Sequence, residues 1–172
     1  MPREINLEKE IDRLYAVPAE EFTGKKKELA NKLRGQGERA AAMRVEDLRK
    51  PTAAAAAVNH LARNERMNIR ALLAAGDRLR EAQTKLLRGA SPTAIHKAAD
   101  DERKALSALV AAARREGASD PILRKVEQTL RAAAIDEDAR ALLQQGRLTQ
   151  DLQPIGFGFA PEQLRGRTRS SK

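Results

Sequence analysis

The chain has 172 residues, with 33 Lys or Arg against 24 Asp or Glu, so its formal net charge is +9 at pH 7. It contains no Cys or Trp, one Tyr and three Phe, which excludes disulfides and thiolate metal sites and leaves mainly Ala, Leu, Ile and Val for a core. The first residues are charged, and no apolar run approaches the roughly 18 residues of a membrane span, so we expect a cytoplasmic protein without membrane contact.

Apolar residues recur at helical spacing along most of the chain and predict a series of α-helices. Proline and glycine mark the boundaries, because the residue before proline avoids the helical region and glycine commonly follows a helix end. The predicted helices cover 5–15, 19–34, 38–49, 52–63, 67–88 and 91–116, then one from Asp120 to about Ala133 and a short one from Asp136 to Gly146.

The helix over 67–88 has the longest clear apolar stripe, and we expect the other helices to pack around it. Gly76 lies in the middle of this stripe and costs about 1 kcal/mol against alanine in a helix. A close crossing by another helix is the predicted compensation. The stripe consists of Ile69, Leu72, Gly76, Leu79, Gln83, Leu86 and Leu87.

These patterns predict an all-α fold, a multi-helix bundle of about eight helices over 1–152. Residues 153–172 differ, because two prolines and two glycines within 153–161 prevent a regular helix. We predict an extended arm there, followed by a basic tail that is disordered.

Two patterns of charged residues deserve comparison with known kinds of site. His96 and Asp100 share a helix face, but nothing completes a metal site, and a local ion pair is the simpler interpretation. Glu102 falls within an apolar stripe, so we expect either an ion pair with Arg80 on the neighbouring helix or a side chain that reaches the edge of the stripe.

No catalytic motif is present. The sequence contains no Gly-x-Ser-x-Gly, no Walker loop and no His-Glu-x-x-His, and nothing marks two carboxylates as an acid and base pair. We therefore expect a protein that is not an enzyme and uses neither a cofactor nor a metal.

The basic surplus favours nucleic acid as a partner, bound non-specifically through its phosphates. Residues 51–90 carry 7 basic against 3 acidic side chains, and 151–172 carry 4 against 2. A composition rich in Ala and Arg also occurs in biased proteomes, where arginine merely solvates helices, so both interpretations stand. The candidate contacts are Arg63, Arg66, Arg70, Arg78, Lys85 and Arg88, with Arg165, Arg167, Arg169 and Lys172 in the tail.

The alternative function is a helical protein–protein adaptor or a self-associating scaffold. Apolar residues alternate in the predicted arm, at Ile155, Phe157 and Phe159, and this segment holds half of the chain's aromatic side chains. An extended arm of this kind fits a groove on a protein partner or on a second copy of the chain.

Several stretches resemble an uncharacterised family of small, basic, Ala/Arg-rich helical proteins of high-GC bacteria. The resemblance implies a helical fold and a bacterial cytosolic setting, with no activity attached. Alanine stands near position 56, where the family pattern has a tryptophan. The stretches are Val45 to Thr52, Ala57 to Arg63, Ala75 to Ala82, Thr129 to Ala133 and Gly146 to Thr149.

Overall fold

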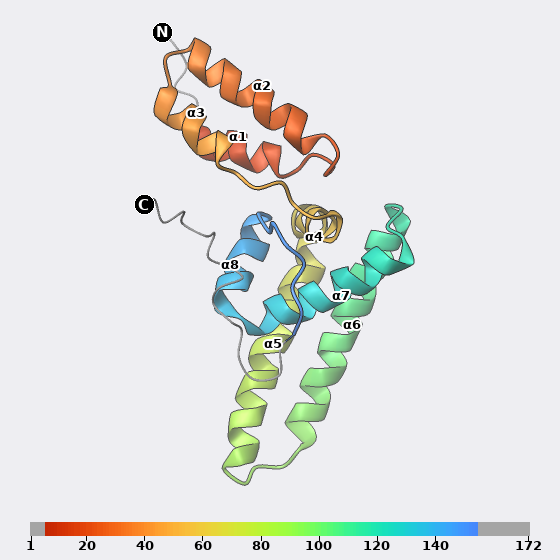
Figure 1. Cartoon of the computed structure of the whole chain (residues 1–172). Coiled ribbons are helices and arrows are strands. Elements are labelled where there is room, and N and C mark those ends of the chain that lie inside the picture. The colour runs from red at the N-terminus through yellow and green to blue at the C-terminus, as the bar shows by residue number, and fades with distance from the viewer. Residues whose placement is uncertain (1–5, 155–172) are drawn as a thin grey trace, which may run out of the picture.

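The computed structural model describes residues 6–154, which form eight α-helices and no strand (Figure 1). The predicted all-α fold with about eight helices is therefore confirmed. The helices are α1 (Leu7–Leu14), α2 (Phe22–Gly35), α3 (Arg39–Glu46), α4 (Ala53–Asn64), α5 (Arg66–Leu87), α6 (Thr93–Arg115), α7 (Asp120–Ile135) and α8 (Glu137–Gln145).

Side-chain caps explain where three of these helices begin. Asn6, Thr52 and Asp136 each accept a hydrogen bond from a backbone N–H in the first turn of α1, α4 and α8. Each bond satisfies a donor that has no partner within its helix. The start of the last helix at Asp136 was predicted from the sequence, and it is confirmed.

The helices α4 to α8 enclose the larger hydrophobic core, which we call the core of the body (residues 51–152). Alanine supplies much of this core, and α4 and α7 pack against each other with many of their alanines buried. Small side chains let helices approach closely, which compensates for the scarcity of aromatic residues. The largest fully buried side chains are Leu61, Leu72, Leu109, Leu130, Leu143, Leu148, Leu152 and Val58.

The helices α1 to α3 form a separate three-helix unit with its own core, which we call the N-terminal unit (residues 6–48). Tyr15 and Phe22 pack against each other at its centre, with 5.1 Å between the ring centroids. The unit lies at one end of the body, above α4 in Figure 1. The bundle is therefore built around two hydrophobic clusters, where the sequence suggested one.

The final described segment, 147–152, is fixed to the body by two buried polar side chains. Asn59 donates a hydrogen bond to the Leu148 carbonyl at 2.9 Å and accepts one from the Leu148 N–H at 2.8 Å. The Thr129 hydroxyl accepts a hydrogen bond from the Leu152 N–H at 2.9 Å. These bonds satisfy the backbone of an irregular segment inside the protein.

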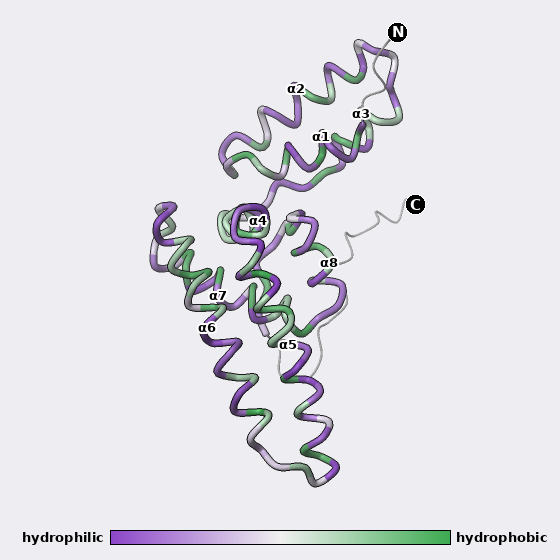
Figure 2. The backbone as a smooth tube through the Cα atoms, turned by 180° about the vertical axis from the view of Figure 1, so that it is seen from behind, coloured by the Kyte–Doolittle hydropathy of each residue, from purple (hydrophilic) through white to green (hydrophobic). Residues whose placement is uncertain are grey.

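The helices α5 and α6 form a long antiparallel hairpin whose far half projects beyond α7 and α8 (Figure 1). The tube coloured by hydropathy shows both polar and apolar residues along this projecting part (Figure 2). The prediction that the whole stripe of α5 faces inward is wrong at its end, where Leu86 is 40% and Leu87 90% exposed. No other described helix reaches that end to cover these side chains.

Within residues 6–154, no helix combines the length and the apolar character that crossing a bilayer requires.

Candidate anion-binding cleft

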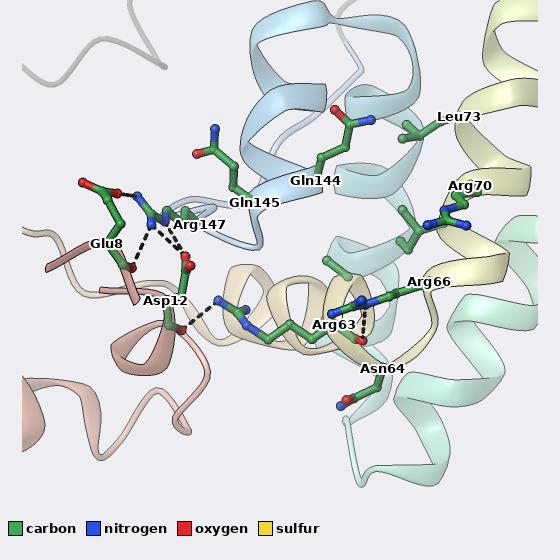
Figure 3. A pocket seen from close by; sticks show the side chains of 12 residues that line it. Glu8, Asp12, Arg63, Asn64, Arg66, Arg70, Leu73, Gln144, Gln145 and Arg147 are labelled. Carbon is green, nitrogen blue, oxygen red and sulfur yellow. Dashed lines mark hydrogen bonds and ion pairs between the residues drawn. The ribbon is translucent and has the colours of Figure 1, made fainter. Parts of the chain in front are cut away.

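A cleft of about 940 Å³ opens where the N-terminal unit meets the body (Figure 3). Helix α1 supplies one wall, the first turns of α5 supply another, and α4 and the end of α8 contribute the rest. Cationic, anionic, amide and apolar side chains all reach it. We call it the basic cleft, and its lining consists of Glu8, Asp12, Ala62, Arg63, Asn64, Arg66, Ile69, Arg70, Leu73, Gln144, Gln145 and Arg147.

Arg66 and Arg70 lie one turn apart on α5 and are exposed along the cleft. Arg66 donates a hydrogen bond from Nε to the Arg63 carbonyl at 3.2 Å. Neither guanidinium forms an ion pair with a carboxylate of residues 6–154. Two neighbouring arginines whose charges are uncompensated create a positive potential that attracts anions.

Arg63 has a different role, because its guanidinium joins three parts of the chain. It donates hydrogen bonds to the carbonyls of Asp12 at 3.0 Å, Asn59 at 3.0 Å and Gly146 at 3.0 Å. Gly146 has a φ of +65°, and a Cβ there would lie 2.5 Å from Arg63 Nη1, so glycine suits this position for two reasons. Burial lowers the pKa of Arg63 from its usual value.

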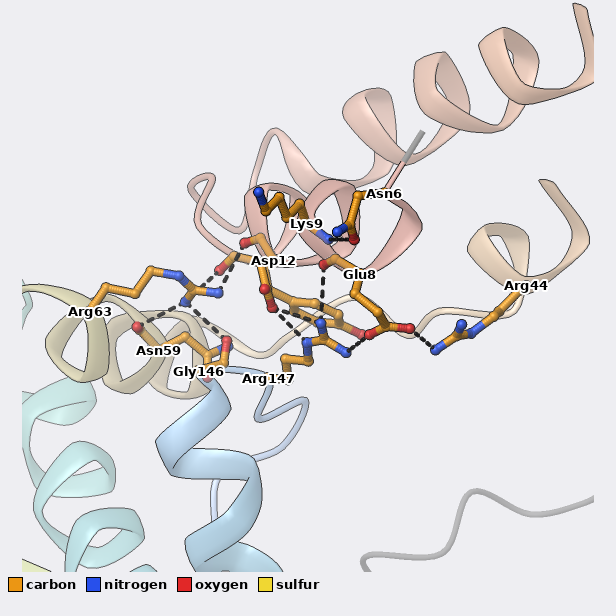
Figure 4. Close-up of polar contacts among 10 residues, drawn as sticks. Asn6, Glu8, Lys9, Asp12, Arg44, Asn59, Arg63, Gly146 and Arg147 are labelled. Carbon is orange, nitrogen blue, oxygen red and sulfur yellow. Dashed lines mark hydrogen bonds and ion pairs between the residues drawn. The ribbon is translucent and has the colours of Figure 1, made fainter. Parts of the chain in front are cut away.

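Arg147 holds the N-terminal unit against the body (Figure 4). Its Nη1 lies 2.8 Å from Glu8 Oε2, and its Nη2 lies 2.7 Å from Asp12 Oδ1. Arg44 of α3 contacts the Glu8 carboxylate as well. Hydrogen bonds from Arg147 and then Arg44 lower the pKa of Glu8 below its ordinary value.

The remaining lining adds neutral polar groups and an apolar wall. The amides of Gln144 and Gln145 extend from the end of α8 (Figure 3). Ile69 and Leu73 are buried in α5 between and beside the two arginines. Amide N–H groups donate hydrogen bonds to anions without adding charge. The lining therefore combines guanidinium, carboxylate, amide and apolar groups.

The structure brings together three of the six basic residues predicted on α4 and α5, namely Arg63, Arg66 and Arg70. The other three lie outside the basic cleft, on the projecting hairpin. There Arg78 pairs with Asp101 at 3.3 Å and Lys85 with Glu81 at 2.7 Å, and Arg88 caps the end of α5.

Two groups of predicted contacts lie outside the described residues, so they stay predictions. They are the tail cations Arg165, Arg167, Arg169 and Lys172 and the partner-binding arm residues Ile155, Phe157 and Phe159.

Sequence reasoning missed Arg147 and the glutamines of α8. Helix α8 is short and displays no basic face, Arg147 lies just beyond its end, and the contact of Arg147 with α1 joins residues more than 130 positions apart. The available signal was a basic residue directly after the Gly146 helix stop, which alone indicates no partner.

Neither of the two ion pairs considered from the sequence forms, neither Glu102 with Arg80 nor His96 with Asp100. Arg131 of α7 lies 4.0 Å from Glu102, whose side chain is 14% exposed, while Arg80 contacts Asp77 and Glu137. Glu102 therefore has a neighbour on α7 in place of the expected one on α5. Asp100 accepts a hydrogen bond from Arg103 at 3.0 Å in place of the expected contact with His96.

Comparison of the chain with protein-family models, with curated proteins and with solved structures finds no match.

Proposed function

We propose that this protein binds nucleic acid without catalysing a reaction, and that the phosphate backbone enters the basic cleft. The observation that carries the proposal is the pair of exposed arginines on α5, Arg66 and Arg70, which make no ion pair with a carboxylate of residues 6–154. The proposed setting is the cytoplasm.

The spacing of the two arginines suits a chain of phosphates. Side chains four positions apart on a helix have Cβ atoms about 5–6 Å from each other, so both guanidinium groups can reach neighbouring anionic groups. A guanidinium donates two parallel hydrogen bonds to a phosphate, which makes arginine the favoured residue for this contact. Gln144 and Gln145 supply further donors from the end of α8.

The lining also indicates how selective the binding is. Among residues 6–154, no aromatic side chain lines the basic cleft, so the described lining offers no platform on which bases could stack. Phosphate contacts position a protein on nucleic acid without reading its sequence. We therefore expect binding that is insensitive to sequence and falls steeply as the salt concentration rises.

The experiment compares two double variants in titrations of a fluorescent 16-base-pair duplex at about 50 and 200 mM salt. Arg66→Gln/Arg70→Gln removes the cleft pair. Arg39→Gln/Arg124→Gln is the control, because both of these arginines are exposed and lie outside the cleft. Each variant lowers the net charge by the same amount.

We expect the cleft variant to bind the duplex at least about tenfold more weakly than the wild type at low salt. The slope of its plot of log K against log salt concentration should be smaller in magnitude by about 2. The control should lose much less. If the two variants lost equal affinity for the duplex, binding would depend only on the net charge of the protein, and the cleft would be rejected as the binding site. Wild-type binding that does not weaken between about 50 and 200 mM salt would reject the function.

A further inference from the structure

The N-terminal unit and the body share no hydrophobic core within residues 6–154. Each has its own buried cluster, so each can keep its packing if the two separate. The chain passes between them at Lys50-Pro51. On one side of this link, the Arg49 carbonyl accepts a hydrogen bond from the Tyr15 hydroxyl, and on the other, Thr52 N–H donates to the Thr149 carbonyl.

Polar contacts hold the two parts together instead, and most of them converge on two arginines of the body (Figure 4). Arg147 pairs with both carboxylates of the α1 wall, Glu8 and Asp12, and its Nη2 also donates to the Glu8 carbonyl at 3.1 Å. Arg63 adds hydrogen bonds to the carbonyls of Asp12 and Tyr15. We call the set formed by Arg147, Glu8 and Asp12 the latch.

The latch lies in the basic cleft itself, because Glu8, Asp12 and Arg147 are part of its lining. Carboxylate and phosphate accept the same pair of hydrogen bonds from a guanidinium. The side chain of Arg147 is 18% exposed, whereas those of Glu8 and Asp12 are about half exposed, at 51% and 50%. The carboxylates therefore lie on the solvent side of the arginine, where an arriving anion would compete with them.

We propose that the N-terminal unit is an inhibitory lid on the basic cleft, and that a nucleic-acid phosphate opens it by replacing Glu8 and Asp12 on Arg147. This inference rests on the proposed function. Once a phosphate lies in the cleft, its charge repels both carboxylates, so α1 loses its strongest anchor. Opening leaves Arg63, Arg66, Arg70 and Arg147 on one continuous surface of the body.

The test uses the full chain with dyes on two introduced cysteines, Lys27→Cys on α2 and Gln128→Cys on α7. Both positions are exposed, and the chain has no other cysteine. Energy transfer between the dyes reports the distance between the N-terminal unit and the body. The latch variant is Glu8→Gln/Asp12→Asn. Its control, Glu21→Gln/Glu38→Gln, removes the same charge from exposed residues of the same unit that do not line the cleft.

With the latch intact, we expect high transfer that falls when the 16-base-pair duplex is added. The latch variant should show low transfer without duplex and bind the duplex about tenfold more tightly than the wild type, because binding no longer has to open the lid. The control variant should keep high transfer and gain far less affinity. Circular dichroism checks that each variant keeps its helices.

Two results would overturn the lid. One is energy transfer that stays unchanged while the duplex binds, in a protein whose binding depends on Arg66 and Arg70. That result would reject the lid and leave the proposed function intact. The other is an equal gain in affinity for the latch variant and its control. Absence of duplex binding by both the wild type and the latch variant would reject the lid together with the function. Binding by the latch variant alone would support the lid.

Discussion

Gly76 of α5 crosses α7 so closely that a Cβ at this position would lie 2.6 Å from the Ala134 carbonyl oxygen. Backbone, and not a flexible side chain, occupies this space, so the two helices cannot accommodate a larger residue without separating. The close crossing predicted from a glycine in the middle of an apolar stripe is confirmed. The contact brings α5, which bears Arg66 and Arg70, against the helix that precedes α8.

The first prediction concerns that crossing. Gly76→Ala should lower the free energy of unfolding by about 1–3 kcal/mol, because the clash with the Ala134 carbonyl outweighs the helix propensity that alanine adds. Urea unfolding followed by circular dichroism measures the change. Gly24→Ala is the matched control, since a Cβ at Gly24 meets nothing within 4 Å. That variant should be unchanged or more stable by up to about 1 kcal/mol.

The second prediction concerns the polar anchor of segment 147–152. Asn59→Ala should cost about 2–3 kcal/mol in urea unfolding, because it leaves the buried N–H and carbonyl of Leu148 without their partner. Asn31→Ala, at an exposed position of α2, should change stability by less than about 0.5 kcal/mol. Similar losses in the two variants would show that the Asn59 amide does not hold this segment.

The third prediction separates the two halves of the α5 stripe. Leu72→Ala should cost about 2–5 kcal/mol, because Leu72 is fully buried in the core of the body. Leu87→Ser should cost less than about 0.5 kcal/mol, because Leu87 is 90% exposed at the end of the hairpin. Thermal unfolding of the two variants gives the comparison, and a large loss for Leu87→Ser would mean that the end of the hairpin is covered in solution.

The fourth prediction is a pH dependence at the contact between α5 and α8. Arg140 lies 2.6 Å from Asp77 Oδ1 and also reaches Oδ2 at 2.7 Å. Its hydrogen bonds lower the pKa of Asp77 below the ordinary value. The stabilisation is therefore fully present above the pKa of the unfolded chain, about 4, and is lost as the pH falls through the lower folded pKa.

The measurement compares wild type and Asp77→Asn by urea unfolding at about pH 7, 5 and 3. We expect a difference below about 1 kcal/mol, because the Asp77 side chain is 55% exposed and solvent screens the pair. The difference should persist from pH 7 to 5 and shrink at pH 3. Asp100→Asn, which alters a pair within one helix, controls for the loss of a surface carboxylate. A difference that grows as the pH falls contradicts the sign.

The local structure of this chain is determined by its sequence. Proline before a helix, glycine after it and a capping side chain such as Asp136 mark many of the helix ends, because these residues restrict or satisfy the backbone within a few positions. The charge surplus around α5 can also be read from the sequence, and it includes Arg66 and Arg70, which line the basic cleft. Helix boundaries and faces need only nearby residues, so a sequence is sufficient to predict them.

Only the tertiary structure decided which of these faces meet. The buried side chains form two cores. Glu8 and Asp12 contact Arg147, which is more than 130 positions away in the sequence. Glu102 lies near Arg131, and the expected pair with Arg80 does not form. The structure also shows that Arg63, a predicted nucleic-acid contact, donates hydrogen bonds to four backbone carbonyls. An apolar stripe shows that a helix packs against another element, but which element it packs against follows from the packing of all the helices together.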